Sequence, residues 1–177
     1  MLSKWEELAL IAKCATTDSR SAFERLVVEY SPELRRYLMN LTLGDASLTD
    51  DLAQDTFLKA YMSIRSFQGL SRFKTWLFRI AINEYYAYVR KRREQRMDGM
   101  AETPVIECVT PLRNVEAGID VQKCLAVLSE TERSVVLLFY MNDLPIKEIV
   151  KITGMPEGTV KSHLSRAKVK MAKVFNV

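Results

Sequence analysis

Five polar side chains follow one another at helical spacing in the middle of the chain. They are Arg79, Asn83, Tyr86, Arg90 and Arg93, separated by four, three, four and three residues, so one face of a helix presents all of them. Guanidinium groups neutralise phosphates, an amide can read the edge of a base, and an aromatic ring lets an unpaired base stack. Duplex DNA requires only the first two. This stripe therefore predicts contact with nucleic acid, and its ring favours an opened strand.

A short loop precedes the stripe and is typical of a hinge. Residues 68–72 read Gln-Gly-Leu-Ser-Arg, and the flexibility of Gly69 fits a loop that could hold a flipped base. The further candidates for such a contact are Gln68, Ser71, Arg72 and Trp76. For Trp76 and Tyr86, packing in the core is an equal alternative.

The helix that positions the stripe is apolar on two sides. Phe73, Leu77 and Ile80 line one face, and Phe78 and Ile82 line a second, nearly opposite face. Core packing is favoured for these side chains, so we expect the helix to be packed on both sides. If every aromatic side chain belonged to the core, the arginines would form only a solvated face.

A second basic helix lies near the C-terminus, after a glycine turn at Gly154. From about Glu157 onward, Val160, Leu164 and Ala167 recur at spacings of four and three and predict the buried face. The opposite and flanking positions hold the candidate DNA contacts Thr159, Lys161, Ser162, His163, Ser165, Arg166, Lys170 and Lys173. Two helices joined by such a turn are typical of a helix-turn-helix that reads the major groove. A helical hairpin with a wet basic face is the alternative.

An acidic cluster predicts a different partner. Asp45, Asp50, Asp51 and Asp55 have no basic residue among them, although the net charge of the chain is +4. The outward face of their helix carries Asp51, Gln54 and Asp55, which suit a basic protein surface. Metal binding is disfavoured because the helix is expected to be exposed.

Composition excludes several classes of protein. The 177 residues are 48% apolar and 27% charged, as in an ordinary soluble protein. Three cysteines without CxxC spacing and a single histidine argue against zinc and disulfides, and favour a reducing, cytoplasmic compartment. Neither a membrane span nor a signal peptide is expected. We find no catalytic constellation, which argues against an enzyme, and expect no cofactor or metal.

Hydrophobic periodicity predicts helices from end to end, with one interruption. In the first half, Ser21 and Glu24 suggest a capping box, Pro32 suggests two successive helices or one kinked helix, and Ser47 or Thr49 is expected to cap the acidic helix. The period disappears over 97–118, which reads as a mostly extended linker.

After the linker, three more signals predict helix boundaries. Ser129 and Glu132 suggest a second capping box, Pro145 suits the first turn of a helix, and Gly154 suits a helix end. We therefore predict an all-α chain of two small helical domains, 1–96 and 119–177, joined by a flexible linker at 97–118, with the helix-turn-helix in the second domain.

Three stretches together resemble the extracytoplasmic-function (ECF) group of bacterial RNA polymerase sigma factors. They are DDLAQDTFLKAY at 50–61, FQGLSRFKTWLFRIAIN at 67–83 and LPIKEIVKITGMPEGTVKSHLSRAKVKM at 144–171. The likeness covers roughly 22–93 and 121–171. Many regulators share the last stretch, whereas the first two at this distance before it are far more specific.

The resemblance implies a role for each surface. The acidic helix would dock on the clamp helices of the polymerase β′ subunit through a polymerase-docking set, Asp51, Gln54, Asp55 and Phe57. A minus-10 set would recognise and melt that promoter element: Gln68, Ser71, Arg72, Trp76, Arg79, Asn83, Tyr86, Arg90 and Arg93. The eight basic-helix candidates named above form a minus-35 set. The resemblance further implies core RNA polymerase, including its β flap, and promoter DNA as partners, and commonly an anti-sigma factor.

Two departures and two rival classes qualify this picture. Ala87 stands where the family often has an acidic residue and His163 where it often has a basic one, which puts fine promoter sequence in doubt. A helix-turn-helix regulator that binds duplex DNA without polymerase would not need the aromatic stripe or the acidic face. A DNA-acting enzyme such as a serine recombinase would need a nucleophile, and the sequence offers none in a catalytic setting.

Overall fold

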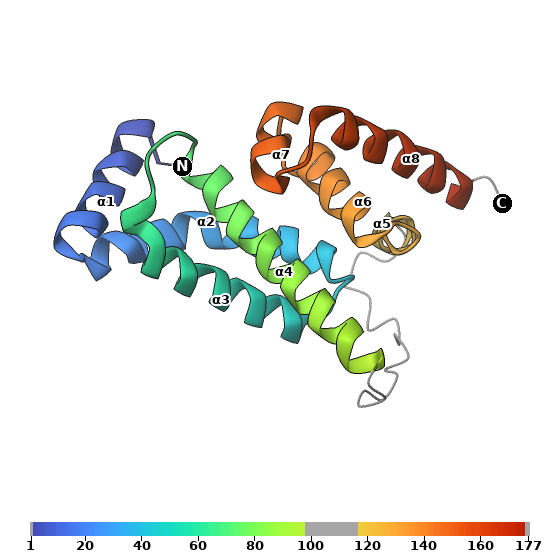
Figure 1. Cartoon of the computed structure of the whole chain (residues 1–177), viewed down its shortest axis with the longest axis horizontal. Coiled ribbons are helices and arrows are strands. Elements are labelled where there is room, and N and C mark those ends of the chain that lie inside the picture. Colours follow the sequence, from blue (N-terminus) through green and yellow to red (C-terminus); the bar gives the residue numbers. More distant parts are fainter. Residues whose placement is uncertain (1, 98–116, 176–177) are drawn as a thin grey trace.

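The computed structural model describes residues 2–97 and 117–175, and the regular structure in these two stretches is helical throughout. The α-helices, one 3₁₀ turn (η1) and one π-helical turn (η2) follow in the order α1 (Lys4–Thr17), α2 (Arg20–Leu41), α3 (Ala46–Ser63), η1 (Ile64–Ser66), α4 (Phe73–Met97), α5 (Ala117–Ala126), α6 (Glu130–Val136), η2 (Leu137–Met141), α7 (Ile146–Thr153) and α8 (Glu157–Phe175). Helices α1 to α4 form an N-terminal unit and α5 to α8 a C-terminal unit (Figure 1). The predicted all-α fold class is confirmed.

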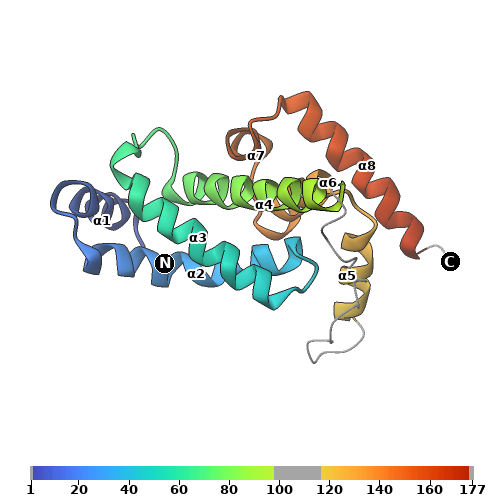
Figure 2. The same cartoon turned by 60° about the horizontal axis from the view of Figure 1, so that its bottom comes forward.

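Helix α4 lies at the centre of the molecule and is packed on two sides, as its two apolar faces predict. It packs against α3 on one side and against α7 on the other, and Figure 2 shows it running between them. Phe73, Leu77, Phe78 and Ile82 are buried. The rings of Phe78 and Tyr37 of α2 lie 5.2 Å apart and join α4 to the core of the N-terminal unit.

Helix α2 differs from its prediction at its start and at its proline. Ser19, not Ser21, is the N-cap, and its hydroxyl accepts a 3.3 Å hydrogen bond from the backbone N–H of Ala22. The helix continues through Pro32 without a second start. Pro32 is exposed, so the carbonyl that lacks its usual donor can bond to water instead.

Helix α3 is also capped by an unexpected residue. The carboxylate of Asp45 accepts a 2.9 Å hydrogen bond from the N–H of Leu48, so the predicted caps Ser47 and Thr49 were wrong. Thr49 is fully buried and its hydroxyl lies 2.8 Å from that of Thr42. A residue turned into the core in this way is not available to cap a helix end.

The C-terminal unit follows its predicted signals closely. Ser129 and Glu132 form the predicted capping box of α6, and Gly154 ends α7 in the left-handed region at φ 72°. Pro145 lies one position earlier than predicted, as the N-cap residue of α7. Most of the predicted linker, 98–116, lies outside the described residues, whereas Met97 belongs to α4 and Ala117 to α5.

Candidate nucleic-acid interface

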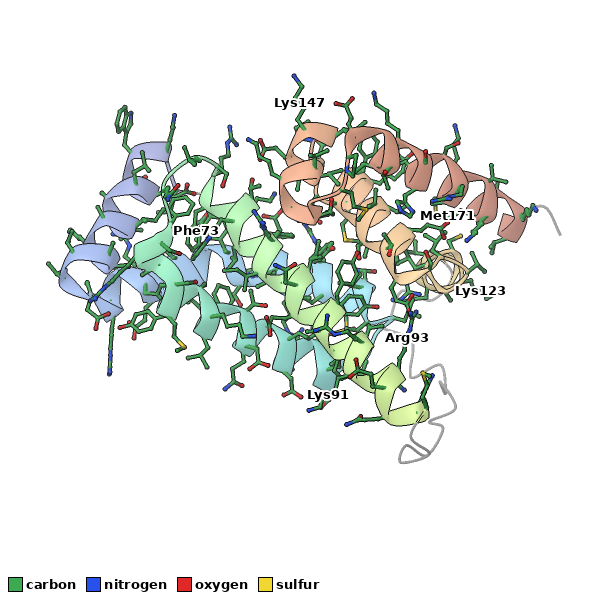
Figure 3. The ribbon with its side chains drawn as sticks, viewed as in Figure 1. Phe73, Lys91, Arg93, Lys123, Lys147 and Met171 are labelled. Carbon is green, nitrogen blue, oxygen red and sulfur yellow. The ribbon has the colours of Figure 1, made fainter. Side chains whose placement is uncertain are left out.

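The predicted stripe on α4 is exposed over most of its length. Arg79, Asn83 and Arg90 are exposed, and none of the three carries an ion pair within the described structure. Arg93 is exposed as well, but its guanidinium lies 3.2 Å from the carboxylate of Glu130 on α6. Figure 3 shows Arg93 reaching from α4 toward the C-terminal unit while Lys91 points away from it. Cations and an amide thus share one open face, which suits a nucleic acid backbone with base contacts.

Tyr86 departs from the exposed stripe. Its hydroxyl is buried against α6, near Ser134 and Thr131, and burial raises the pKa of Tyr86. Burial also raises the pKa of the neighbouring Tyr85 to about 12. The helical period correctly placed Tyr86 on the same face of α4 as the other members of the stripe. The C-terminal unit covers that part of the face, which a local pattern cannot reveal.

The loop before α4 is built as a turn with an exposed tip. Gly69 has φ 69°, and Leu70 beside it is 81% exposed. Gln68 and Arg72 are exposed too. A left-handed backbone at this position favours glycine, which explains why the loop carries one here.

Trp76 and Ser71 belong to a cavity under that loop. The indole of Trp76 packs against Phe67 and Phe73, with ring centroids 5.3 and 5.6 Å away. Its outer side faces a cavity of about 270 Å³, whose lining residues are Leu70, Ser71, Thr75, Trp76, Arg79 and Lys151. Trp76 therefore packs in the core on one side and faces an open, partly basic cavity on the other.

Helix α8 presents its predicted polar side chains on an open face. Lys161, Ser162, Ser165, Arg166, Lys170 and Lys173 are exposed, whereas Thr159 and His163 are half-buried. Burial and the nearby Arg166 lower the pKa of His163, so the ring is neutral at neutral pH. The basic character of this face comes from its lysines and Arg166.

Glu132 is a site residue that sequence reasoning missed in this role. Its carboxylate, only 5% exposed, lies 2.7 Å from Nζ of Lys170 and 3.8 Å from Nε of Arg166. Burial alone would raise the pKa of Glu132, but hydrogen bonds from Lys170 and Ser129 outweigh burial and the pKa is lowered. The sequence identified Glu132 as a helix cap. Its ion pairs with Lys170 and Arg166, two members of the minus-35 set, depend on how α6 packs against α8.

The acidic face of α3 is open, with one change from its prediction. Asp51, Gln54 and Asp55 are exposed and Phe57 is half-buried against the core. Asp50 has a counter-charge that the prediction did not include. It accepts hydrogen bonds of 2.8 and 3.3 Å from Arg35 of α2, and these bonds lower the pKa of Asp50.

Apolar side chains extend the acidic face of α3. Leu58 is 55% exposed and Met62 is 74% exposed. Nothing in the residue pattern indicated that this pair lies at the surface, since both are ordinary core residue types. Acidic and apolar groups side by side are typical of a protein-docking surface.

Within residues 2–97 and 117–175 there is neither a metal-ligand cluster nor a membrane-spanning helix. No three His, Cys, Asp or Glu side chains come together there as ligands for a metal ion. No helix in these stretches is both long and apolar enough to cross a membrane.

Family comparisons agree with the two units. Residues 26–95 match the model of sigma-70 region 2, and residues 119–171 match that of sigma-70 region 4. The chain is 31% identical to the ECF RNA polymerase sigma factor SigM of Bacillus subtilis over 150 residues, which is 83% of this chain and 91% of SigM. It is 30% identical to the RNA polymerase sigma-H factor of Pseudomonas aeruginosa over 181 residues, or 95% of this chain and 93% of the relative.

A solved structure supports the same assignment. The sigma factor RpoE from Bartonella quintana, crystallised with the anti-sigma factor NepR, is 32% identical and superimposes with a TM-score of 0.74 over 88% of this chain and 97% of RpoE. The chain belongs to the ECF sigma factors of bacterial RNA polymerase. Its function is to direct promoter-specific transcription, with core RNA polymerase and promoter DNA as partners. A regulator that acts on duplex DNA alone is not favoured.

Proposed function

We propose that residues 1–96 dock on core polymerase and open the minus-10 element, that 119–177 read the minus-35 element, and that 97–118 link them. The minus-10, minus-35 and polymerase-docking sets act through the surfaces described above. The observation that supports this most is the open stripe of α4. Arg79, Asn83 and Arg90 stay exposed on a helix that is packed on both sides, so the stripe lies on a rigid support, as a reading surface requires.

Promoter opening by this stripe can be measured with potassium permanganate, which reports unpaired thymines. A triple variant, Arg79→Ala, Asn83→Ala and Tyr86→Ala, is expected to bind core polymerase normally and to open a cognate promoter poorly. Stacking on one aromatic ring contributes about 1 to 3 kcal/mol per base, so Tyr86→Ala alone should impair opening more than closed binding.

Tyr86→Phe is the matched control for the ring. It keeps the stacking surface and removes only the hydroxyl, which is buried, so opening should stay near that of the wild type. Wild-type opening in the triple variant, with core binding intact, would reduce the stripe to a solvated surface.

The same proposal assigns the face of α3 to the β′ clamp helices, and a surface of the C-terminal unit to the β flap. Asp51 and Asp55 are exposed, and Leu58 and Met62 add apolar area beside them. Reversing both carboxylates to lysine should weaken core binding at least tenfold, because like charges facing each other cost several kcal/mol.

The reversal at Asp51 and Asp55 needs a control for charge alone. Glu24→Lys changes an equally exposed carboxylate on α2 and should leave core binding unchanged. Both proteins should unfold at the wild-type temperature. Normal core binding by the double variant would remove α3 from the docking surface.

A sigma factor works where polymerase works, so we place the chain in the cytoplasm, with neither catalysis nor a cofactor of its own. RpoE was crystallised with an anti-sigma factor, and we propose that a protein of this class also holds the present chain inactive. Recovery of one specific inhibitor with the tagged chain from uninduced cells, and its loss on induction, is the expected result.

A further inference from the structure

The guanidinium of Arg166, a member of the minus-35 set, is held by two neighbouring side chains. Its Nη2 lies 3.1 Å from Nδ1 of His163, one turn earlier on α8. Its Nε lies 3.8 Å from Oε1 of Glu132 on α6. Both contacts use the same edge of the guanidinium, the one formed by Nε and Nη2. A long side chain with many rotamers is therefore restrained by two partners on two helices.

The carboxylate of Glu132 is a fixed support for this arrangement. The side chain is 5% exposed, and its Oε2 accepts hydrogen bonds of 3.0 Å from the backbone N–H of Ser129 and 2.7 Å from Nζ of Lys170. The bond from Ser129 belongs to the capping box of α6, so the carboxylate is tied to the start of that helix. Helix α6 packs against α8 (Figure 1), which brings Oε1 to Arg166.

The second support, His163, works only as a neutral ring. A guanidinium has donors and no acceptor, so Nδ1 of His163 accepts from Arg166 and the ring proton is on Nε2. The charged groups that act on the ring are Arg166 and Lys170 on α8 and Glu132 on α6. Burial and Arg166 lower the pKa of His163, which keeps the accepting form at neutral pH.

The type of residue at position 163 decides whether this contact can form. Lysine and arginine carry donors only, so either of them at this position would repel Arg166 instead of accepting from it. Histidine supplies an acceptor at the same place on the helix. His163 therefore gives Arg166 a partner that a basic side chain there could not provide.

The restraint leaves the outer edge of Arg166 for DNA. The side chain is 59% exposed, and Nη1 together with the second hydrogen of Nη2 forms a parallel pair of donors. Such a pair matches O6 and N7 of guanine in the major groove. An unrestrained arginine can turn to a phosphate instead, a contact that every sequence offers equally. Restraint of the guanidinium therefore favours the contact that discriminates between base pairs.

We propose that His163 and Glu132 are positioning residues for minus-35 recognition, which hold Arg166 ready for a guanine and so sharpen the specificity of α8. The proposal rests on the assignment of α8 to the minus-35 element, and neither residue has to touch DNA. Ordering one long side chain before binding should raise discrimination about two- to tenfold at the base pair that Arg166 contacts.

Holoenzyme binding to promoters with each of the four base pairs at successive minus-35 positions tests the proposal. Arg166→Ala identifies the contacted position, where it should lose the preference for guanine. His163→Ala should lower the same preference about two- to tenfold. His163→Asn is the matched rescue, because the side-chain oxygen of asparagine can accept in place of Nδ1, and it should keep the wild-type preference.

A pH series separates positioning from simple packing. Protonated His163 has two donors, so Arg166 loses its acceptor as the pH falls through the lowered pKa of the ring. The guanine preference of the wild type should hold from about pH 8 to about pH 7 and fall toward about pH 5.5. His163 is the only histidine of the chain, so His163→Asn should remove this pH dependence. His163→Arg should show the low preference at every pH.

Glu132→Gln tests the other support. It removes the charge that attracts Nε of Arg166 and should lower the guanine preference across the same pH range.

A wild-type preference in His163→Ala, in a protein that unfolds at the wild-type temperature, would overturn the positioning role of His163. Equal pH profiles for the wild type and His163→Asn would overturn it as well. A wild-type preference in Glu132→Gln would remove Glu132 from the proposal. A wild-type holoenzyme that does not distinguish minus-35 sequences at all would instead refute the proposed function.

Discussion

Helices α4 and α8 carry the two basic surfaces, but they are supported in opposite ways. α4 is packed against α3 and α7 and buries residues on both sides. On α8, within the part whose side chains the structure describes, only Val160 and Ala167 are buried. One helix is held within the molecule, and the other lies on its surface.

This difference matches the DNA that each helix is proposed to read. An α-helix with its side chains is about 10 to 12 Å across, and the major groove is about 12 Å wide. A helix that enters the groove must therefore be free around most of its circumference, as α8 is. α4 offers only a stripe between two packed faces, which suits a strand lying across it and cannot enter a groove.

Core substitutions should destabilise α4 more than α8. Phe78 of α4 and Val160 of α8 are both fully buried. Phe78→Ala should lower the free energy of unfolding by about 3 to 5 kcal/mol, and Val160→Ala by about 1.5 to 3 kcal/mol. Urea unfolding followed by circular dichroism measures both. Equal losses would mean that α8 is held as firmly as α4, and the comparison would fail.

The sequence predicted the faces of these helices better than their ends. A period of 3.6 over many residues identifies a buried face even when single positions mislead, and Phe78 and Val160 lie where the period put them. Where a helix begins depends on which of several neighbouring residues acts as its N-cap. Ser19 and Ser21 are chemically equal caps, and the fold decided between them.

In the candidate site too, the sequence predicted some features and missed others. Arg79 and Asn83 are exposed as predicted, because exposure on one helix follows from its own pattern. The cover over Tyr86 comes from Ser134 and Thr131, far along the chain. The ion pair between Glu132 of α6 and Lys170 of α8 also joins separate helices. Contacts between separate helices have no local signal, so the sequence could not predict them.

Two substitutions on α8 distinguish a base contact from a phosphate contact. If Arg166 reads a guanine, Arg166→Ala should remove about 1 to 3 kcal/mol of discrimination at one upstream base pair. Lys173→Ala, at an exposed position near the end of α8, should weaken all sequences alike and reduce the salt dependence by about one charge. Holoenzyme binding to single-base-pair promoter variants separates the two. A uniform loss from both changes would make Arg166 a phosphate contact.

Helix α8 has no second packed face, and an ion pair with Glu132 of α6 helps to hold it in place. The lowered pKa of Glu132 means that its ionised form stabilises the fold, through Lys170 above all. A carboxyl group with a depressed pKa in the folded state contributes stability above its unfolded pKa, about 4.5, and loses that contribution as the pH falls through the folded value.

Glu132→Gln keeps the capping box, since glutamine also serves at this position, and removes only the charge. At pH 7 it should cost about 1 to 2 kcal/mol, and the gap to the wild type should narrow as the pH falls below about 4.5. Glu130→Gln, half-buried on the same helix turn, is the control for charge at the start of α6. Urea unfolding at a series of pH values measures the gap, and a gap that stays constant down to pH 3 would show that the charge of Glu132 does not hold α8.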